Sequence, residues 1–303
     1  MGVIWMPSEK HYLSIINNLF DGVYFVNKDR RIILWNNAAE RITGYKSEEI
    51  VGQCCQNNIL NHIDCDGRSL CLLGCPLFAT IIDGRQRKDT VFLLHKKGHR
   101  VSVFINTFPI MQGDDIIGAV EVFKQNSSKV NDTDYSKIED VWFDDSELEF
   151  TNHEKIENYI LYRLNELKKF RRKFCVVSSD IDNFDESTYI YGHEAMESLL
   201  RNIYKSIKYN INPSDFFCHR NGDGFIGIFE IKNNYEATLL AEKIRILTAG
   251  SELPHDLHNL SITASLGVTV ARKEDTVDSI LQRAEILMHQ SMVKKTNCVS
   301  SDA

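Results

Sequence analysis

The sequence has no long hydrophobic run, and its charge balance is not basic. Its apolar stretches are far shorter than the roughly 20 residues that a membrane-spanning helix needs, and its first seven residues lack the basic region and long apolar stretch of a secretory signal. A net charge of −7 argues against nonspecific nucleic-acid binding. We therefore expect a cytoplasmic protein that binds neither membrane nor nucleic acid.

The composition is otherwise that of an ordinary soluble protein. Hydrophobic residues make up 43% of the 303 residues and charged residues 25%. A chain of this length is expected to form about two domains, each with its own hydrophobic core. No internal repeat is visible in the sequence.

The first part of the chain predicts five strands interrupted by short helices. A helix is expected over residues 9–19, and polar turns such as Lys97-Gly98 separate the later strands. The expected strands and short helices follow in the order 23–26, 31–35, 36–45, 47–52, 90–94, 100–109 and 116–123. His95 and His99 flank one of these turns and are expected to be solvated hairpin residues.

This order of elements resembles a PAS domain over about residues 10–125. The most specific part runs from Asp21-Gly22-Val23 through Trp35-Asn36-Asn37-Ala38-Ala39 to Gly44-Tyr45. The resemblance implies an antiparallel five-stranded sheet with helices, and a sensory role. In such a domain an unknown small ligand is held between sheet and helices, and the signal leaves through the last strand.

Five of the eight cysteines lie between Cys54 and Cys75, where a reducing compartment favours thiols or metal ligands over disulfides. The cluster is similar to one in a bacterial group of PAS domains. The matching positions, Cys55, His62, Cys71 and Cys75, would suit tetrahedral Zn²⁺ or an iron–sulfur cluster. The alternative interpretation is a set of small buried hydrophobic residues with a hydrogen-bonded histidine.

The second part of the chain predicts helices alternating with strands of a mixed sheet. A polar segment at 126–150, with a short helix at about 134–143, would link it to the first part. We therefore expect domains at residues 1–125 and 151–303. The expected helices are 152–169, 193–208, 235–248 and 276–292, and the expected strands are 174–179, 215–220, 225–230 and 260–269.

Two carboxylates are expected at one end of this sheet. Asp180 ends a buried strand, and Asp223 lies at the tip of a hairpin in which glycines supply the turn. A strand-end carboxylate beside a hairpin carboxylate can hold Mg²⁺ and leave coordination positions for phosphate oxygens. This arrangement points to metal-assisted phosphoryl or nucleotidyl transfer.

The order and spacing of three motifs resemble the GGDEF domain of diguanylate cyclases. They are Asp180-Ile181-Asp182-Asn183-Phe184, Tyr191-Gly192-His193 and Asn221-Gly222-Asp223-Gly224-Phe225. The resemblance implies a mixed sheet flanked by helices, a homodimer, and binding of GTP or another nucleotide. It assigns catalysis to Asp180 and Asp223, with the carbonyl of Ile181 as a further Mg²⁺ ligand. The nucleotide would contact Thr188, Glu197, Asn221 and Gly222.

Several positions depart from the family pattern. The first glycine of the hairpin motif is Asn221, and its essential Glu is Gly224. Asp185 replaces a phosphate-facing Lys, and Thr188 and Glu197 replace the Asn and Asp that read guanine. The product-inhibition motif R-x-x-D has no Arg, because it reads Asn212-Pro213-Ser214-Asp215.

Three functional interpretations follow from these departures. The first is a sensor-coupled protein of cyclic-di-GMP signalling whose degenerate, weak or inactive GGDEF domain binds a nucleotide or a protein partner. The second is an active Mg²⁺-dependent diguanylate or dinucleotide cyclase, with an altered nucleotide preference as a variant. The third is a metal or redox sensor that acts through the cysteine and histidine cluster.

Overall fold

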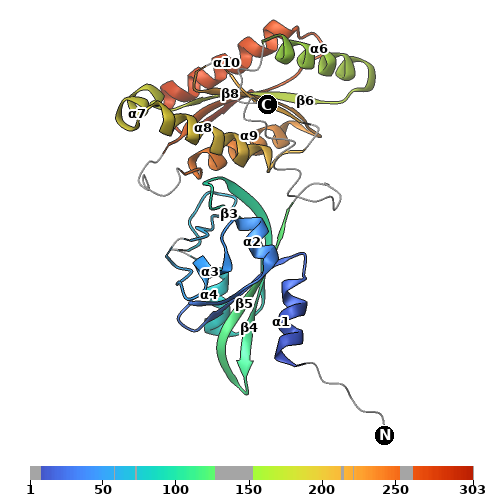
Figure 1. Ribbon diagram of the computed structural model, residues 1–303. Helices are drawn as coiled ribbons and strands as arrows, with labels where there is room; N and C mark the ends of the chain where they lie inside the picture. Colours follow the sequence, from blue (N-terminus) through green and yellow to red (C-terminus); the bar gives the residue numbers. More distant parts are fainter. Residues whose placement is uncertain are drawn as a thin grey trace. The chain divides into compact units, whose positions relative to one another are not determined.

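The chain divides into two compact units, residues 1–127 and 128–303 (Figure 1). The computed structural model describes residues 8–57, 59–71, 74–126, 153–212, 215–220, 222–252 and 262–302. The predicted linker helix at about 134–143 lies outside the described residues, as does all of the 126–150 segment except Asn126. Each unit is described here by itself.

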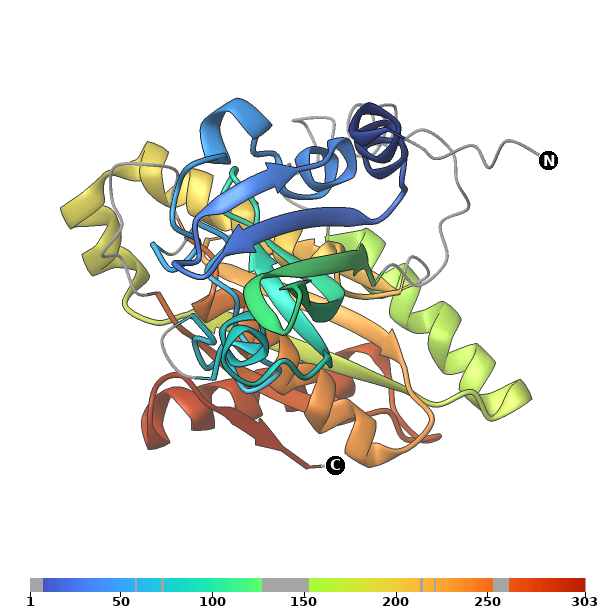
Figure 2. The same ribbon diagram turned by 90° about the horizontal axis from the view of Figure 1, so that it is seen from below.

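The first unit is built on a five-stranded antiparallel sheet in the order β2-β1-β5-β4-β3. The β1 and β2 strands run side by side as the blue arrows of Figure 2. The elements of this unit are α1 (Glu9–Asn17), β1 (Gly22–Asn27), β2 (Ile32–Trp35), α2 (Asn37–Thr43), α3 (Ser47–Ile50), α4 (Pro76–Asp83), β3 (Arg87–Leu94), β4 (Arg100–Gln112) and β5 (Asp115–Gln125).

Asn36 fixes the junction between β2 and α2. Its side-chain oxygen accepts hydrogen bonds from the backbone N–H groups of Val23 (2.9 Å) and Ala39 (2.8 Å), so it caps the helix and holds it to β1. Gly44 ends α2 in the left-handed conformation, with φ of 75°. Local sequence signals therefore set both ends of this helix.

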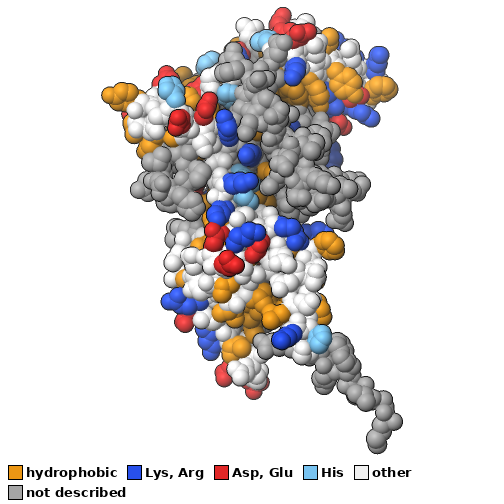
Figure 3. Space-filling model, viewed as in Figure 1, with side chains coloured by type: hydrophobic (Ala, Val, Ile, Leu, Met, Phe, Trp, Pro, Cys, Tyr) orange, Lys and Arg blue, Asp and Glu red, His pale blue; other side chains and the backbone are white. Residues whose placement is uncertain are grey.

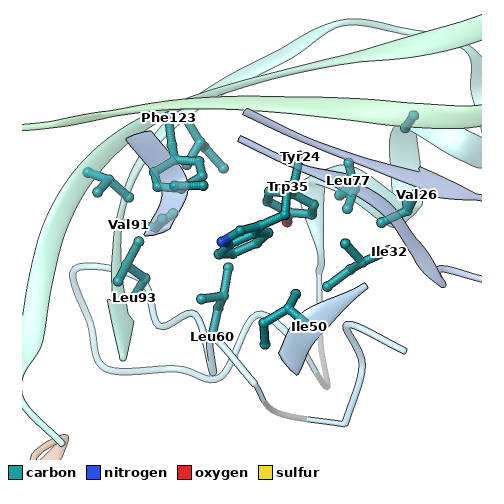
Figure 4. Close-up of a cluster of buried hydrophobic side chains, with 14 of the residues drawn as sticks. Tyr24, Val26, Ile32, Trp35, Ile50, Leu60, Leu77, Val91, Leu93 and Phe123 are labelled. Atoms are coloured by element: carbon teal, nitrogen blue, oxygen red, sulfur yellow. The ribbon is translucent and has the colours of Figure 1, made fainter. Parts of the chain in front are cut away.

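The hydrophobic core of the first unit lies against the inner face of its sheet. Tyr24 and Phe123 come from the two central strands, and Trp35 packs beside them with ring centroids 5.4 Å from Tyr24 and 6.4 Å from Phe123 (Figure 4). The indole N–H of Trp35 donates to the carbonyl of Tyr45, so burial leaves this polar group satisfied.

His95 and His99 are not solvated, which corrects the sequence expectation. They are 6% and 4% exposed, and their rings stack with centroids 4.3 Å apart. The reason is packing across the sequence: a Cβ at Gly44 would lie 2.5 Å from the His95 ring, so the C-terminus of α2 lies directly against this turn.

The second unit is built on a five-stranded sheet in the order β10-β9-β6-β8-β7. It is mixed, as expected, but its fifth strand, β10, was not predicted. β10 runs parallel to β9, and the other pairs are antiparallel. The elements are α6 (His153–Phe170), β6 (Phe174–Ile181), α7 (Phe184–Tyr191), α8 (His193–Lys208), β7 (Phe216–His219), β8 (Gly224–Glu230), α9 (Asn234–Ala249), β9 (Ala264–Val270), α10 (Val277–Lys294) and β10 (Val299–Ser301).

Helices cover both faces of this sheet. α6 and α10 lie on one face, and α8 and α9 lie on the other (Figure 1). The residues that join α6 and α10 to the sheet are apolar and buried; they include Ile160, Leu164, Phe174, Ile228 and Ala284. A strand covered on both faces is expected to be apolar throughout, and Phe174 to Val177 of β6 are all buried.

No helix in the described part of the chain combines the length and the hydrophobicity that crossing a bilayer requires.

Close contact between α10 and β9 depends on Gly267. A Cβ at this position would lie 2.2 Å from both the Ala284 carbonyl oxygen and the Met288 backbone nitrogen. These atoms belong to the helix backbone, so no side-chain rotation would relieve the clash.

We predict that Gly267→Ala lowers the free energy of unfolding of the second unit by about 3 kcal/mol or more, because α10 must move away from the sheet. Chemical denaturation measures this. Gly192→Ala is the matched control: its Cβ would meet nothing within 4 Å, so only its left-handed backbone should cost about 1–2 kcal/mol. Equal losses in the two variants would contradict the assigned role of Gly267.

Candidate functional site

The structure brings the carboxyl groups of Asp180 and Asp223 into contact. Asp180 lies near the end of β6, the central strand, where it pairs with Gly224 of β8 and Ser265 of β9. Its carboxyl group is hydrogen-bonded to that of Asp223 and accepts a hydrogen bond from the backbone N–H of Ile181. Two residues 43 positions apart in the sequence therefore form one acidic pair at one end of the sheet.

Electrostatics favour a proton or a cation between these two groups. Burial, together with the hydrogen bond and negative charge of Asp223, raises the pKa of Asp180 to about 7. The buried Oδ1 atom of Asp180 has no hydrogen-bond partner among the described residues. Two touching carboxyl groups with a spare buried oxygen are suited to a small divalent cation that prefers oxygen ligands.

The hairpin that carries Asp223 is held at its base by two hydrogen bonds. The Arg220 N–H donates to the Gly224 carbonyl at 2.8 Å, and Nε2 of His219 donates to the Gly222 carbonyl at 2.9 Å. Gly222 adopts the left-handed conformation, with φ of 89°, as the turn prediction requires. Asn221, the first residue of the motif, lies outside the described residues.

Gly224 occupies the position nearest to the carboxyl pair. It lies directly opposite Asp180 in the β6–β8 ladder, so a side chain here would project to the same face as that of Asp180. Its backbone is not left-handed, and an added Cβ would lie 3.0 Å from the carbonyl oxygen of Ser179. A glutamate at this site would therefore need a shift of a few tenths of an ångström, but no change of backbone conformation.

The two positions predicted to read the base lie on α7 and α8. The hydroxyl of Thr188 donates to the carbonyl of Phe184 at 2.8 Å, within its own helix. Glu197 is exposed, with its carboxylate 3.8 Å from Nη2 of Arg201. Neither side chain bonds to the carboxyl pair among the described residues, so their role in base recognition stays a prediction.

The start of α7 is unusually acidic for a surface that would face phosphates. Asp185 and Glu186 both lie in its first turn. A helix N-terminus normally attracts anions through its unpaired N–H groups and its dipole. Two carboxylates already satisfy that preference, so a triphosphate would meet repulsion at this end of the helix.

Asp182 has a structural role that the sequence interpretation missed. It is 5% exposed and accepts hydrogen bonds from the hydroxyls of Thr263 (2.6 Å) and Ser265 (2.7 Å) and from the backbone N–H of Asn297 (2.9 Å). It thus fastens the segments before β9 and after α10 to the end of β6. Two hydroxyl residues at alternate positions, Thr263 and Ser265, were the available signal for a buried acceptor.

The residues of the R-x-x-D position serve the fold. Asp215 is 7% exposed and accepts hydrogen bonds from the backbone N–H groups of Asn212 (3.1 Å) and Glu230 (3.3 Å). The two residues between Asn212 and Asp215 lie outside the described residues. The retained carboxylate is therefore used in closing the loop before β7.

The interior of the first unit contains a buried pair of titratable groups, His62 and Glu121. The carboxyl of Glu121 is 3.7 Å from Nε2 of His62 and is hydrogen-bonded to the hydroxyl of Tyr24. Burial raises the pKa of Glu121 to about 8 and lowers the pKa of His62 to about 4. Both groups are therefore neutral at pH 7, and this close approach is not an ion pair.

The structure gives no support to the metal site expected at Cys55, His62, Cys71 and Cys75. Within the described ranges, no group of three or more His, Cys, Asp or Glu side chains is placed to hold a metal ion. Burial raises the pKa of the Cys71 thiol to about 11 and also raises those of Cys55 and Cys75. A bound metal would have to displace these thiol protons, because the thiolate is the form that binds metals. Metal binding at these positions stays a prediction.

Two family models match the chain. Residues 145–298, just over half of it, match the model described as "Diguanylate cyclase, GGDEF domain", and residues 21–127 match a PAS domain model. Both resemblances seen in the sequence are thereby confirmed.

Curated relatives match over less than half of the chain. The response regulator PleD of Caulobacter vibrioides is 29% identical over 127 residues, which cover 41% of this chain and 28% of PleD. Diguanylate cyclase A of Treponema denticola is 25% identical over 156 residues, which cover 49% of this chain and 42% of that enzyme. The chain therefore spans less than half the length of these relatives.

Among solved structures, the GGDEF domain of DgcB from Caulobacter crescentus, in complex with c-di-GMP, is similar. It has a TM-score of 0.47 and 21% sequence identity, and the match covers 50% of this chain and 88% of that one.

We predict that Asp180→Asn removes a pH dependence from the stability of the second unit. The folded pKa of Asp180 is raised from 3.8 to about 7, so wild-type stability should fall as pH rises through that window. Asn cannot lose a proton, and in the absence of divalent cations the variant should be more stable at pH 8 by about 1–2 kcal/mol, allowing for solvent screening. Thermal unfolding across pH measures this, with exposed Asp185→Asn as control. Parallel wild-type and Asp180→Asn curves would refute the prediction.

A second pH dependence is expected in the first unit. The folded pKa of Glu121 is raised from 4.5 to about 8, so its contribution to stability is lost as pH rises across that range. Glu121→Gln keeps a hydrogen-bonding group but cannot ionise. The loss of unfolding free energy as pH rises should therefore be smaller in this variant than in the wild type by about 3–5 kcal/mol. Denaturation followed by fluorescence as the buried Trp35 becomes exposed reports on this unit when Trp5 and Trp142 are replaced by Phe in all the proteins compared. An unchanged slope would mean that the buried carboxyl is already ionised in the wild type.

Proposed function

Because the chain belongs to the diguanylate cyclase GGDEF family, we propose that it is a PAS-regulated protein of cyclic-di-GMP signalling with a weakened GGDEF domain. In this proposal the second unit binds a nucleotide together with Mg²⁺ but forms cyclic dinucleotide slowly or not at all. The contact between Asp180 and Asp223, beside Gly224 in place of a third carboxylate, is the observation that supports it most strongly.

The carboxyl pair fits a magnesium ion. Asp180 and Asp223 would hold it through their oxygens, with the Ile181 carbonyl as a further ligand. Bound Mg²⁺ supplies electrostatic stabilisation of phosphate oxygens, which favours attack of a 3′-hydroxyl on an α-phosphate. Without a cation, the raised pKa of Asp180 means that the pair retains a shared proton near neutral pH.

Three features of the site argue for weak turnover. Gly224 provides no carboxylate opposite Asp180, and the first turn of α7 carries Asp185 and Glu186 where a triphosphate would lie. The hydroxyl of Thr188 donates its hydrogen bond to a carbonyl of its own helix. It is therefore a weaker partner for a nucleotide base than an unbonded side-chain amide would be. The first two features weaken the stabilisation of the reacting phosphates, and the third weakens binding of the base. Among the described residues, no cationic side chain is bonded to the carboxyl pair to compensate.

The nucleotide and the assembly follow from the chemistry of the family. GTP is the first candidate, and Glu197, one methylene longer than the family's Asp, makes another purine nucleotide the alternative. A cyclic dinucleotide joins two nucleotides, so a chain with one such site needs a second copy to make it. We therefore propose a homodimer, with a protein partner as the alternative output of an inactive domain.

The first unit is proposed to regulate the second. Its buried Tyr24, His62 and Glu121 give the PAS interior polar groups suited to a small ligand or a proton. The β5 strand, which carries Glu121, is also the last strand of this unit. A change at Glu121 would therefore act on the strand from which the chain continues toward residue 127.

An active cyclase is the second candidate. The contact between Asp180 and Asp223 favours it, because close carboxyl pairs with a strongly raised pKa, which cost stability near neutral pH, are typical of functional sites. The altered base-reading positions would then indicate a preference for a nucleotide other than GTP.

Incubating the full chain with Mg²⁺ or Mn²⁺ and each nucleoside triphosphate tests the proposal. We expect Mg²⁺ and GTP to raise the melting temperature together, and little cyclic dinucleotide to form. The melting shift should disappear in Asp180→Asn and Asp223→Asn, because both remove a charged ligand. A rapid yield of cyclic dinucleotide that is lost in Asp223→Asn would establish the active cyclase instead.

Gly224→Glu provides the complementary test. Restoring a carboxylate on the face of Asp180 should raise product formation at least about tenfold. Gly224→Gln has the same size without the charge and should not raise it. A wild-type rate equal to that of Gly224→Glu would contradict the view that this position limits the domain.

A further inference from the structure

A basic cavity lies at the opposite end of the second sheet from the carboxyl pair. Its volume is about 470 Å³, and its walls include Arg171, Lys173, Arg272 and Lys273, with Asp302 the one acidic residue among the lining. Arg171 and Lys173 connect α6 to β6, whereas Arg272 and Lys273 follow β9. Four cations thus gather around one hollow in a chain whose net charge is −7.

The cavity is separate from the nucleotide site. β6 begins at Phe174 beside the cavity and reaches Asp180 six residues later, a distance of roughly 20 Å along an extended strand. The antiparallel β9 strand runs the other way, from Ala264 to Val270. The two sites therefore occupy opposite ends of the same two strands.

Most of the positive charge in the cavity is not neutralised. Arg272 pairs with Asp302 at 2.9 Å, and the same carboxylate is shared with Arg283 at 3.1 Å. Arg171, Lys173 and Lys273 make no ion pair with the described residues. Like charges gathered without a counter-charge repel one another, and an anionic ligand would remove that repulsion.

The backbone of the walls is fixed by the sheet. The Ala271 N–H donates to the Phe174 carbonyl at 3.0 Å, and the Ile231 N–H donates to the Lys173 carbonyl at 3.1 Å. Leu167, Val270 and Ala271 add apolar surface to the lining. The cavity is thus a formed hollow with cationic groups and a partly apolar lining. In Figure 3, lysine and arginine side chains gather around the end of α6 from which the chain turns into β6.

We propose that this cavity binds a small phosphorylated organic molecule that carries at least two negative phosphate charges. Its volume lies within the usual range for small-molecule sites. Guanidinium groups bind phosphate through paired N–H donors, and the lysines add point charges. The apolar part of the lining would contact the organic part of the ligand.

Titration calorimetry on the full chain, with excess EDTA, tests this site apart from the Mg²⁺-dependent one. The probes are inorganic triphosphate and ATP. We expect both to bind with an affinity that falls as salt is raised, and ATP to bind more tightly because its organic part meets the apolar lining. Tighter binding of triphosphate than of ATP would overturn the organic part of the proposal.

Charge reversal localises the binding. The double variant Lys173→Glu with Lys273→Glu should weaken triphosphate at least about tenfold. The matched control, Lys28→Glu with Lys124→Glu, makes the same charge change at exposed positions of the first unit, and should leave the affinity within about twofold. Asp180→Asn should also leave it unchanged, so failure here is distinguishable from failure of the proposed function. Both double variants should retain the wild-type melting temperature.

Three results would overturn the proposal. One is no binding of either probe up to about 1 mM. Another is equal weakening by the two double variants, which would indicate a response to net charge only. The third is binding to vesicles of anionic phospholipid without binding to the soluble probes, which would make this end of α6, with its exposed Phe170 (67%), a membrane-facing surface.

Discussion

Contact between two carboxyl groups at the end of one buried strand is the constraint on which the second unit depends. Without a cation, ionisation of both groups at close range costs stability, and the raised pKa of Asp180, about 7, reflects this repulsion together with burial. The fold maintains the contact through the β6–β8 ladder and the hydrogen bonds that close the hairpin. An arrangement that costs stability and is nevertheless held so firmly is best explained by a bound cation.

The surroundings of that pair lack most of the groups that would help a triphosphate to react. Gly224 leaves the face of Asp180 without a third carboxylate, and α7 begins with two acidic residues. The neighbouring Asp182, by contrast, is fully committed to holding three chain segments together. The end of the sheet therefore combines a carboxyl pair suited to a cation with surroundings that lack a third carboxylate and begin α7 with two acidic residues.

Much of the fold follows from local sequence signals, because apolar periodicity, turn glycines and caps specify their own elements. The strand before Asp180, the hairpin around Gly222 and the four long helices of the second unit were predictable in this way, whereas the short helix α7 was not predicted. Features set by long-range packing were not. The burial of His95 and His99 depends on α2, and the partners of Asp182 come from residues 81 to 115 positions away. The spacing of the cysteines does not show that burial raises the pKa values of their thiols, so the metal-binding prediction has no support from the fold. The basic cavity was also invisible in the sequence, because β6 and β9 bring its cations together.

A crystal structure of the full chain grown with Mn²⁺ and a non-hydrolysable GTP analogue tests the central claim most directly. The account predicts an anomalous peak coordinated by Asp180, Asp223 and the Ile181 carbonyl, with the phosphates of the analogue on the same ion. A metal and analogue bound elsewhere, or a carboxyl pair that keeps its direct contact with no metal at saturating Mn²⁺, would contradict it.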